Sequence, residues 1–231
     1  MKVARNWVKL PTGWIAAGGL KAFAWGKEGG SNQTAALMVL LAIAHRADDE
    51  NGLVRLPYDE LQWATHLSRQ KVADGLDVLG SRKIILRGSQ GRSTLQLASY
   101  DPKQGWAMLP ASRLYSSDGI IAFADFHLRK KVELDALKAY LAFVARRDRE
   151  QNRAFITYEQ IHDYAGIPEG RIKPAISLLV VQGLVVVEHM ERSGGLGSSH
   201  GYRLSYLHTR NHMGTNGRAH FGETQAGDDL F

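Results

Sequence analysis

A serine in a glycine-rich segment is the first candidate for chemistry in this chain. Gly197-Ser-Ser199-His-Gly201 matches the spacing G-x-S-x-G, which in hydrolases places a nucleophilic serine on a sharp turn. That geometry requires a strand before the serine and a helix after it, whereas a hairpin tip leading into a strand is expected here. The loop also lacks the Lys-Ser/Thr pair of a phosphate-binding P-loop. Neither acyl transfer nor nucleotide hydrolysis is therefore expected.

Metal ligands and acid–base pairs find equally little support. His208, His212 and His220 stand near the C-terminus, but no acidic or histidine partners at helical spacing complete a metal site. No pair of carboxylates stands out as a general acid–base couple, and the absence of cysteine excludes thiolate ligands and disulfide bonds. We therefore expect a protein that is not an enzyme and that needs no metal or other cofactor.

Charge and hydropathy narrow the class of partner. The 231 residues carry a formal net charge of +6, which favours a polyanionic partner. The most apolar run, residues 34–44, is far too short to span a membrane, and the basic N-terminal segment lacks the apolar stretch of a signal peptide. We expect a soluble, cytoplasmic protein with no membrane partner.

The sequence contains an internal repeat: one module occurs twice, and the second copy starts one hundred residues after the first. Ala36, Leu37, Leu41 and Arg46 in the first copy correspond to Ala136, Leu137, Leu141 and Arg146 in the second. The segment Trp7-Val-Lys-Leu-Pro11 corresponds to Trp106-Ala-Met-Leu-Pro110 with a slip of one residue. A repeat of this length is too long for a solenoid unit and indicates two tandem domains. We place them at residues 1–100 and 101–207, followed by a disordered tail at 208–231.

Apolar spacing and turn residues predict the same order of elements in each copy, a mostly helical α+β fold. In the first copy we expect helices at 33–48, 57–66 and 68–80, strands at 53–56, 84–86 and 93–97. In the second copy we expect helices at 133–149, 157–165 and 171–182, strands at 154–156, 184–187 and 202–206. Predicted helix starts are Ser31 or Asn32, Pro57 in a first turn, Ser68, and Thr157 with Gln160 as a capping box.

This order, with the stretch from Leu56 through Ser68-Arg-Gln-Lys71 to Ile84, resembles winged helix-turn-helix DNA-binding domains. The second copy resembles the same pattern from Ile161 to Leu184. The Trp-x-x-Leu-Pro segment is similar to the leader of winged-helix modules in phage and plasmid replication initiators and replisome organisers. Pro174 departs from the pattern because proline is tolerated only in the first turn of a helix. We therefore expect the third helix of the second copy to begin late, near Gly170 or Arg171.

The resemblance implies that the third helix of each copy enters the major groove of DNA through its first turns. Arginine can bind guanine and glutamine can bind adenine by paired hydrogen bonds, while lysine more often binds phosphate. The expected DNA contacts of the two helices are Ser68, Arg69, Gln70, Lys71, Arg171, Lys173 and Ser177, with Asp74 and Glu169 exposed beside them. An ordinary solvated helix face remains the alternative at each of these positions.

The hairpins and the turns before them supply the remaining predicted contacts, since wings commonly reach the minor groove or nearby phosphates. These residues are Arg82, Lys83, Arg87 and Arg92 in the first copy and Arg192 and His200 in the second. Two modules without a long linker would suit two successive major-groove faces of one duplex. We expect the protein to bind as a monomer or a homodimer, with its two modules reading the site in a pseudo-symmetric or a tandem arrangement. Trp14 and Trp63 are interpreted as core or interface aromatics.

The chain closes on Gly227-Asp-Asp-Leu-Phe231, which resembles the short C-terminal peptides with which replication proteins bind partners. Leu230 and Phe231 are therefore candidate contacts for replisome proteins, although a solubilising tail is the alternative. As a whole, the sequence predicts a double-stranded DNA-binding replication initiator of a plasmid, phage or related mobile element. Two alternatives stay open: a transcriptional regulator or partition-type adaptor, and a protein-interaction scaffold.

Overall fold

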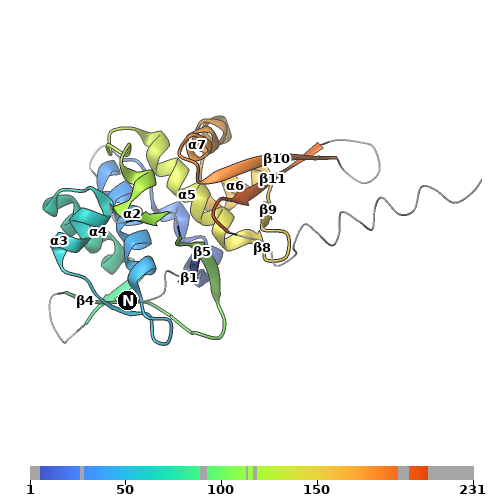
Figure 1. Ribbon diagram of the computed structural model, residues 1–231. Helices are drawn as coiled ribbons and strands as arrows, with labels where there is room; N and C mark the ends of the chain where they lie inside the picture. The colour runs from blue at the N-terminus through green and yellow to red at the C-terminus, as the bar shows by residue number, and fades with distance from the viewer. Residues whose placement is uncertain are drawn as a thin grey trace, which may run out of the picture.

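Two long helices, one from each copy, lie against each other at the centre of the molecule (Figure 1). α2 (Gly30–Arg46) is buried without interruption from Thr34 to Ala44, and α5 (Lys131–Arg146) from Glu133 to Val144. Each is enclosed because its own copy covers one side and the other copy covers the opposite side. This burial explains the apolar run at 34–44, since a helix that is apolar all round is typical of a protein interior.

The computed structural model describes residues 6–26, 29–88, 93–112, 114–116, 119–191 and 198–207, and at 189–191 and 198–199 it describes the backbone alone. The fold is mixed α+β, as the sequence predicts. Within these ranges no helix combines the length and the apolar character needed to cross a membrane.

The first copy places two short helices and a small sheet around α2. Its elements are β1 (Trp7–Pro11), α1 (Gly13–Ala16), the 3-10 helix η1 (Gly19–Ala22), α2, β2 (Leu53–Arg55), α3 (Tyr58–Thr65), α4 (Arg69–Ser81), β3 (Ile85–Arg87) and β4 (Thr94–Leu97). α4 packs along α2, and the antiparallel sheet has the order β2-β4-β3. Val72, Leu76 and Leu79 face inward, as the spacing predicts.

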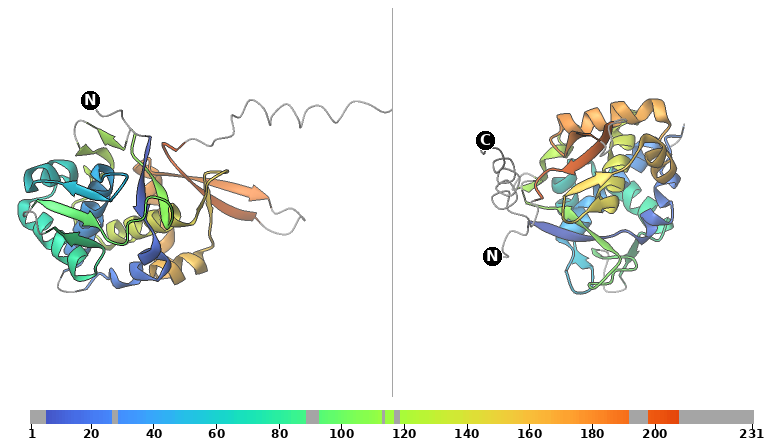
Figure 2. Two further views of the ribbon diagram at one scale, coloured as in Figure 1. Left: turned by 90° about the horizontal axis from the view of Figure 1, so that it is seen from below. Right: turned by 90° about the vertical axis from the view of Figure 1, so that its right-hand side faces the viewer.

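The second copy repeats this plan with a longer hairpin. Its elements are β5 (Trp106–Pro110), β6 (Tyr115–Ser116), β7 (Gly119–Ile120), η2 (Ile121–Phe123), α5, β8 (Arg147–Asp148), β9 (Arg153–Phe155), α6 (Tyr158–Ala165), α7 (Glu169–Val181), β10 (Val185–Glu191) and β11 (Ser198–Leu204). α7 packs along α5, and the sheet has the order β10-β11-β9-β8. Figure 2 shows the β10–β11 hairpin extending away from the body of the molecule.

An approximate two-fold axis relates the copies. The two leader strands, β1 and β5, pair antiparallel with Trp7 opposite Pro110, Lys9 opposite Met108 and Pro11 opposite Trp106, so the pairing is reciprocal. The rings of Trp7 and Trp106 stack at 5.6 Å. Equivalent elements also exchange contacts, because α3 touches β7 of the second copy and α6 touches η1 of the first. The buried apolar residues of both copies form one continuous core.

The start of α2 differs from the prediction. The helix begins at Gly30, three residues early, and neither Ser31 nor Asn32 caps it. Gly29 takes the preceding position with a φ of 111°, a conformation that glycine adopts without steric cost. α4 begins as predicted, because the Ser68 hydroxyl accepts a hydrogen bond from the Lys71 N–H at 3.3 Å. Pro57 precedes α3 instead of lying in its first turn.

Two predictions for the second copy are wrong. α7 begins at Glu169 and runs through Pro174, so the proline lies inside the helix and does not move its start to Gly170 or Arg171. Only one backbone hydrogen bond is lost there, and the carbonyl that the ring would crowd belongs to Gly170, four residues earlier. β11 begins at Ser198, so residues 198–201, part of the predicted hairpin tip, belong to a strand. The Thr157–Gln160 capping box of α6 is present as predicted.

Candidate nucleic-acid interface

α4 presents its first turns to solvent because its other face is fixed against α2. Gly75 makes this close approach possible: a Cβ at this position would lie 3.1 Å from the carbonyl carbon of Ala35. Burial of Val72, Leu76 and Leu79 on that side leaves Arg69, Gln70 and Asp77 exposed on the other. The buried stripe therefore determines which side chains a partner of α4 would meet.

Arg69 is the most accessible cation of this face, with its side chain 68% exposed. Its guanidinium lies 4.9 Å from the centre of the Tyr58 ring and 3.2 Å from a carboxylate oxygen of Asp59. Both partners belong to the beginning of α3, and Arg69, Tyr58 and Gln70 line an open groove of about 790 Å³. An exposed ion pair of this kind contributes little to stability, so an anionic partner can displace Asp59 at low cost.

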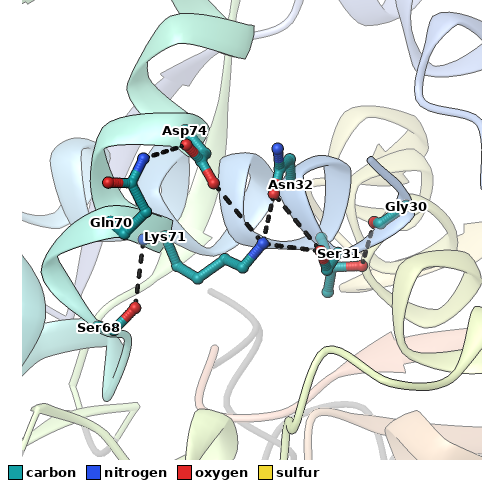
Figure 3. Close-up of polar contacts among 8 residues, drawn as sticks. Gly30, Ser31, Asn32, Ser68, Gln70, Lys71 and Asp74 are labelled. Atoms are coloured by element: carbon teal, nitrogen blue, oxygen red, sulfur yellow. Dashed lines mark hydrogen bonds and ion pairs between the residues drawn. The ribbon is translucent and has the colours of Figure 1, made fainter. Parts of the chain in front are cut away.

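Gln70 and Lys71 differ in the partners of their side chains (Figure 3). The Gln70 amide donates to Asp74 at 2.8 Å along the exposed surface of the helix. The Lys71 ammonium instead turns toward α2, where it donates to Ser31 Oγ at 2.9 Å and Asn32 Oδ1 at 2.6 Å. Asp74 lies 3.6 Å from the same ammonium. Lys71 therefore ties α4 to the start of α2, a role that the sequence analysis missed.

The equivalent position of the second copy has the same role with different chemistry. Arg171, one hundred residues after Lys71, pairs at 2.8 Å with Asp135 on α5, a carboxylate that is 2% exposed. Of the predicted contacts on α7, Lys173 and Ser177 are exposed to solvent, and Glu169 in the first turn places an acid beside them. Lys173 is thus the freely exposed cation of α7, whereas Arg171, two positions earlier, is partly exposed and paired with Asp135.

Of the four residues predicted to contact DNA around the hairpin of the first copy, three are described, and each has a different environment. Arg82 donates to the Ala22 carbonyl at 2.8 Å and lies 4.0 Å over the Phe23 ring, so it is held within the protein. Arg87 forms an ion pair with Asp77 on the exposed surface. Lys83 is exposed on a turn with a φ of 55°. Arg92 lies outside the described residues.

In the second copy, His200 lies on β11 opposite His189 of β10 and is half-buried. Arg192 and the C-terminal pair Leu230 and Phe231 lie outside the described residues.

The outer face of the second sheet carries charges that the sequence analysis missed. Arg153 of β9 and Arg203 of β11 both donate to the carboxylate of Glu188 on β10. Burial opposes ionisation of Glu188, but the hydrogen bonds from Arg203 and Arg153 outweigh it and hold the pKa of the carboxyl below its usual value. Alternation along the strands could have indicated this face. The pairing across three strands could not be read from the sequence.

The two tryptophans predicted to be core or interface aromatics pack in different places. Trp63 of α3 meets the Tyr115 ring of the second copy edge-on at 5.9 Å, which supports its interpretation as an interface aromatic. Trp14 packs against Phe23 at 6.1 Å. In the described part of the chain, no group of three histidine or acidic side chains is placed to hold a metal ion.

Comparison with known proteins adds no family to these observations: no protein-family model matches the chain, and a search of curated proteins finds no significant match.

Proposed function

We propose that this chain is a sequence-specific double-stranded DNA-binding protein that reads its target with two winged-helix modules. The observation that carries the proposal is the repeated order of α2–β2–α3–α4–β3–β4 and α5–β9–α6–α7–β10–β11 around one two-fold interface. In each copy a helix–turn–helix leads directly into a β-hairpin, the arrangement with which winged helices present one helix and one hairpin to DNA.

The exposed chemistry supports a division of labour between the two modules. α4 offers Arg69 and Gln70, which suit guanine and adenine edges, whereas α7 offers Lys173 and Ser177, which suit phosphate oxygens. Lys71 and Arg171 are only partly exposed and are paired with Asn32 and Asp135 of the long helices, so we assign them to holding the recognition helices in place instead of reading bases. Base selection then rests mainly on the first copy.

The approximate two-fold axis favours one of the two arrangements left open by the sequence. Modules related by a two-fold axis face the duplex in opposite senses, so the half-sites are inverted instead of directly repeated. Because α4 and α7 expose different side chains, the two half-sites differ in sequence. We therefore expect one monomer to occupy an imperfect inverted repeat.

The experiment is selection of bound duplexes from a random pool, followed by titration of the selected site at about 150 mM salt. Arg69→Ala is expected to weaken specific binding by roughly 1–3 kcal/mol and to relax the preference at one base pair. Lys103→Ala is the matched control, because it removes the same charge from the exposed connection between the copies. No enrichment of any duplex, or equal effects of the two variants, would refute the proposal.

We further propose that the role of this binding is replication initiation, supported by the leader segment that forms β1 and β5. Selected sites that recur as an array beside an origin, together with loss of replication in Arg69→Ala, are the expected results. Single sites beside promoters with unchanged copy number would point to a transcriptional regulator instead.

A further inference from the structure

A buried lysine connects the two copies at the centre of the molecule. Lys138 lies in the middle of α5, is 3% exposed, and donates from Nζ to the Phe23 carbonyl of the first copy at 2.9 Å. Desolvation by burial lowers the pKa of its ammonium to about 8, although the nearby Asp135 carboxylate acts in the opposite direction. A charged group in this position therefore costs the native state free energy.

The internal duplication shows that packing does not require this charge. The equivalent residue of the first copy is Met38, which is completely buried. A methionine fills nearly the same volume as a lysine stem without the cost of desolvating an ammonium. Stability alone thus gives no reason for Lys138, whereas a directional hydrogen bond to one carbonyl specifies a geometry.

The segment that accepts the hydrogen bond from Lys138 also accepts one from a side chain of the first copy. Arg82 follows directly after α4 and donates to the Ala22 carbonyl at 2.8 Å, with its guanidinium 4.0 Å over the Phe23 ring. Two successive carbonyls, those of Ala22 and Phe23, therefore accept hydrogen bonds from different copies. The end of α4 is connected through this segment to α5.

α5 carries the connection onward to α7 (Figure 1). Asp135 lies one turn before Lys138 and is 2% exposed; it pairs at 2.8 Å with Arg171 in the first turn of α7. The second oxygen of Asp135 is buried and makes no hydrogen bond within the described residues. Arg82, Lys138, Asp135 and Arg171, which we call the charged network, thus join the end of α4 to the start of α7.

We propose that the charged network fixes the placement of α4 relative to α7, so that the protein accepts only one spacing between its two half-sites. This inference rests on the proposed function. Lys138 acts as a positioning residue, because it touches the carbonyl of the first copy and no DNA. Rigid placement makes binding of the second half-site selective, since a partner that does not match a pre-organised surface loses that part of the binding energy.

A distance measurement tests the network without DNA. The chain contains no cysteine, so Ser81→Cys with Val181→Cys places spin labels at the equivalent ends of α4 and α7 in an otherwise unlabelled protein. Pulsed electron paramagnetic resonance is expected to give one narrow distance distribution for this parent. Lys138→Met is expected to broaden or shift it, whereas Met38→Leu, a core substitution without charge at the equivalent position, leaves it unchanged.

Binding to spacing variants tests the consequence. Inserting or deleting two base pairs between the half-sites of the selected duplex is expected to weaken binding of the parent by about tenfold or more, equivalent to ~1.4 kcal/mol. For Lys138→Met the same change is expected to cost less than about threefold. Arg82→Met, which removes the other arm of the network near the surface, is expected to act in the same direction and serves if Lys138→Met does not fold.

The outcomes separate the two proposals. A parent that binds no duplex overturns the proposed function and the spacing selectivity together, whatever the distance distributions. A parent that binds with high specificity while Lys138→Met keeps its narrow distance distribution and its spacing preference overturns only the inference about the charged network. If Lys138→Met broadens the distance distribution but keeps the spacing preference of the parent, the charged network does not set that preference. This result also overturns the inference.

Discussion

Acidification should weaken the contact between the two copies through a single histidine, His45. Its Nε2 donates to the Pro110 carbonyl of the second copy at 2.9 Å, and its ring meets the Tyr115 ring edge-on at 5.3 Å. Nδ1 is buried and has no hydrogen-bond partner in the described structure. Burial lowers the pKa of the ring to about 4, although the hydrogen bond to Pro110 acts in the opposite direction.

The sign and size of the effect follow from the two protonation states. Between about pH 6.5 and pH 4 the unfolded chain protonates this histidine while the native state does not, so the free energy of unfolding falls as the pH falls. From about pH 7.5 to about pH 5 the loss is at most ~2 kcal/mol. Although the ring nitrogens are buried, His45 as a whole residue is only partly buried, and solvent close to it reduces this loss to about 1 kcal/mol.

The assay is urea-induced unfolding of the parent and of His45→Gln at both pH values. Glutamine can still donate to the Pro110 carbonyl but does not titrate, and the other eight histidines are common to both proteins. The parent is expected to lose about 1 kcal/mol more than the variant on acidification. A difference below about 0.3 kcal/mol would show that the native ring takes up its proton as easily as in water, and would refute the reasoning.

Three further predictions concern packing and charge, and each is measured by urea unfolding. Gly119→Ala places a Cβ 2.6 Å from the Trp63 carbonyl oxygen across the interface and should cost more than ~2 kcal/mol of unfolding free energy. Gly105→Ala, at a similarly positive φ of 71° but in open space, should cost about 1 kcal/mol. Equal costs would contradict the close contact. Gly75→Ala should destabilise by ~1–3 kcal/mol through its contact with the α2 backbone, while Gly80→Ala on the same helix, with nothing nearby, should stabilise by about 0.5–1 kcal/mol; stabilisation by both would disprove that contact. As the pH rises from about 7 to about 9.5, the free energy of unfolding of the parent should increase by about 2 kcal/mol relative to Lys138→Met. The reason is that in this range the unfolded lysine keeps its proton while the native one loses it. Parallel pH curves for the two proteins would mean that Lys138 is not desolvated.

The helices were predictable because their signals are local. Ser68, the Thr157–Gln160 pair and the inward stripe of Val72, Leu76 and Leu79 depend on residues a few positions apart, and all are found as predicted. Pro174 shows the limit of such rules. Its local preference opposes a helix interior, but packing of α7 along α5 stabilises the helix enough to outweigh one missing hydrogen bond.

Side-chain partners across the fold were not predictable. Lys71 and Arg171 are residue types that suit groove contacts, yet they pair with Asn32 and Asp135 on the long helices. Those partners lie 39 and 36 residues away in other helices, far beyond the few residues over which helical or strand periodicity acts. Arg69, paired only with the exposed Asp59, and Lys173 stay exposed on the same two helices.

The sequence by itself predicted the repeat, the order of the main helices and hairpin strands in each copy, and the inward faces of the helices, because apolar periodicity and capping act within one element. Only the tertiary structure decided how the copies meet. The antiparallel pairing of β1 with β5 establishes the two-fold relation, and it depends on hydrogen bonds between strands about a hundred residues apart. Lys138 and His45 acquired their partners, and their lowered pKa values, from that same assembly, since burial is a property of the folded chain.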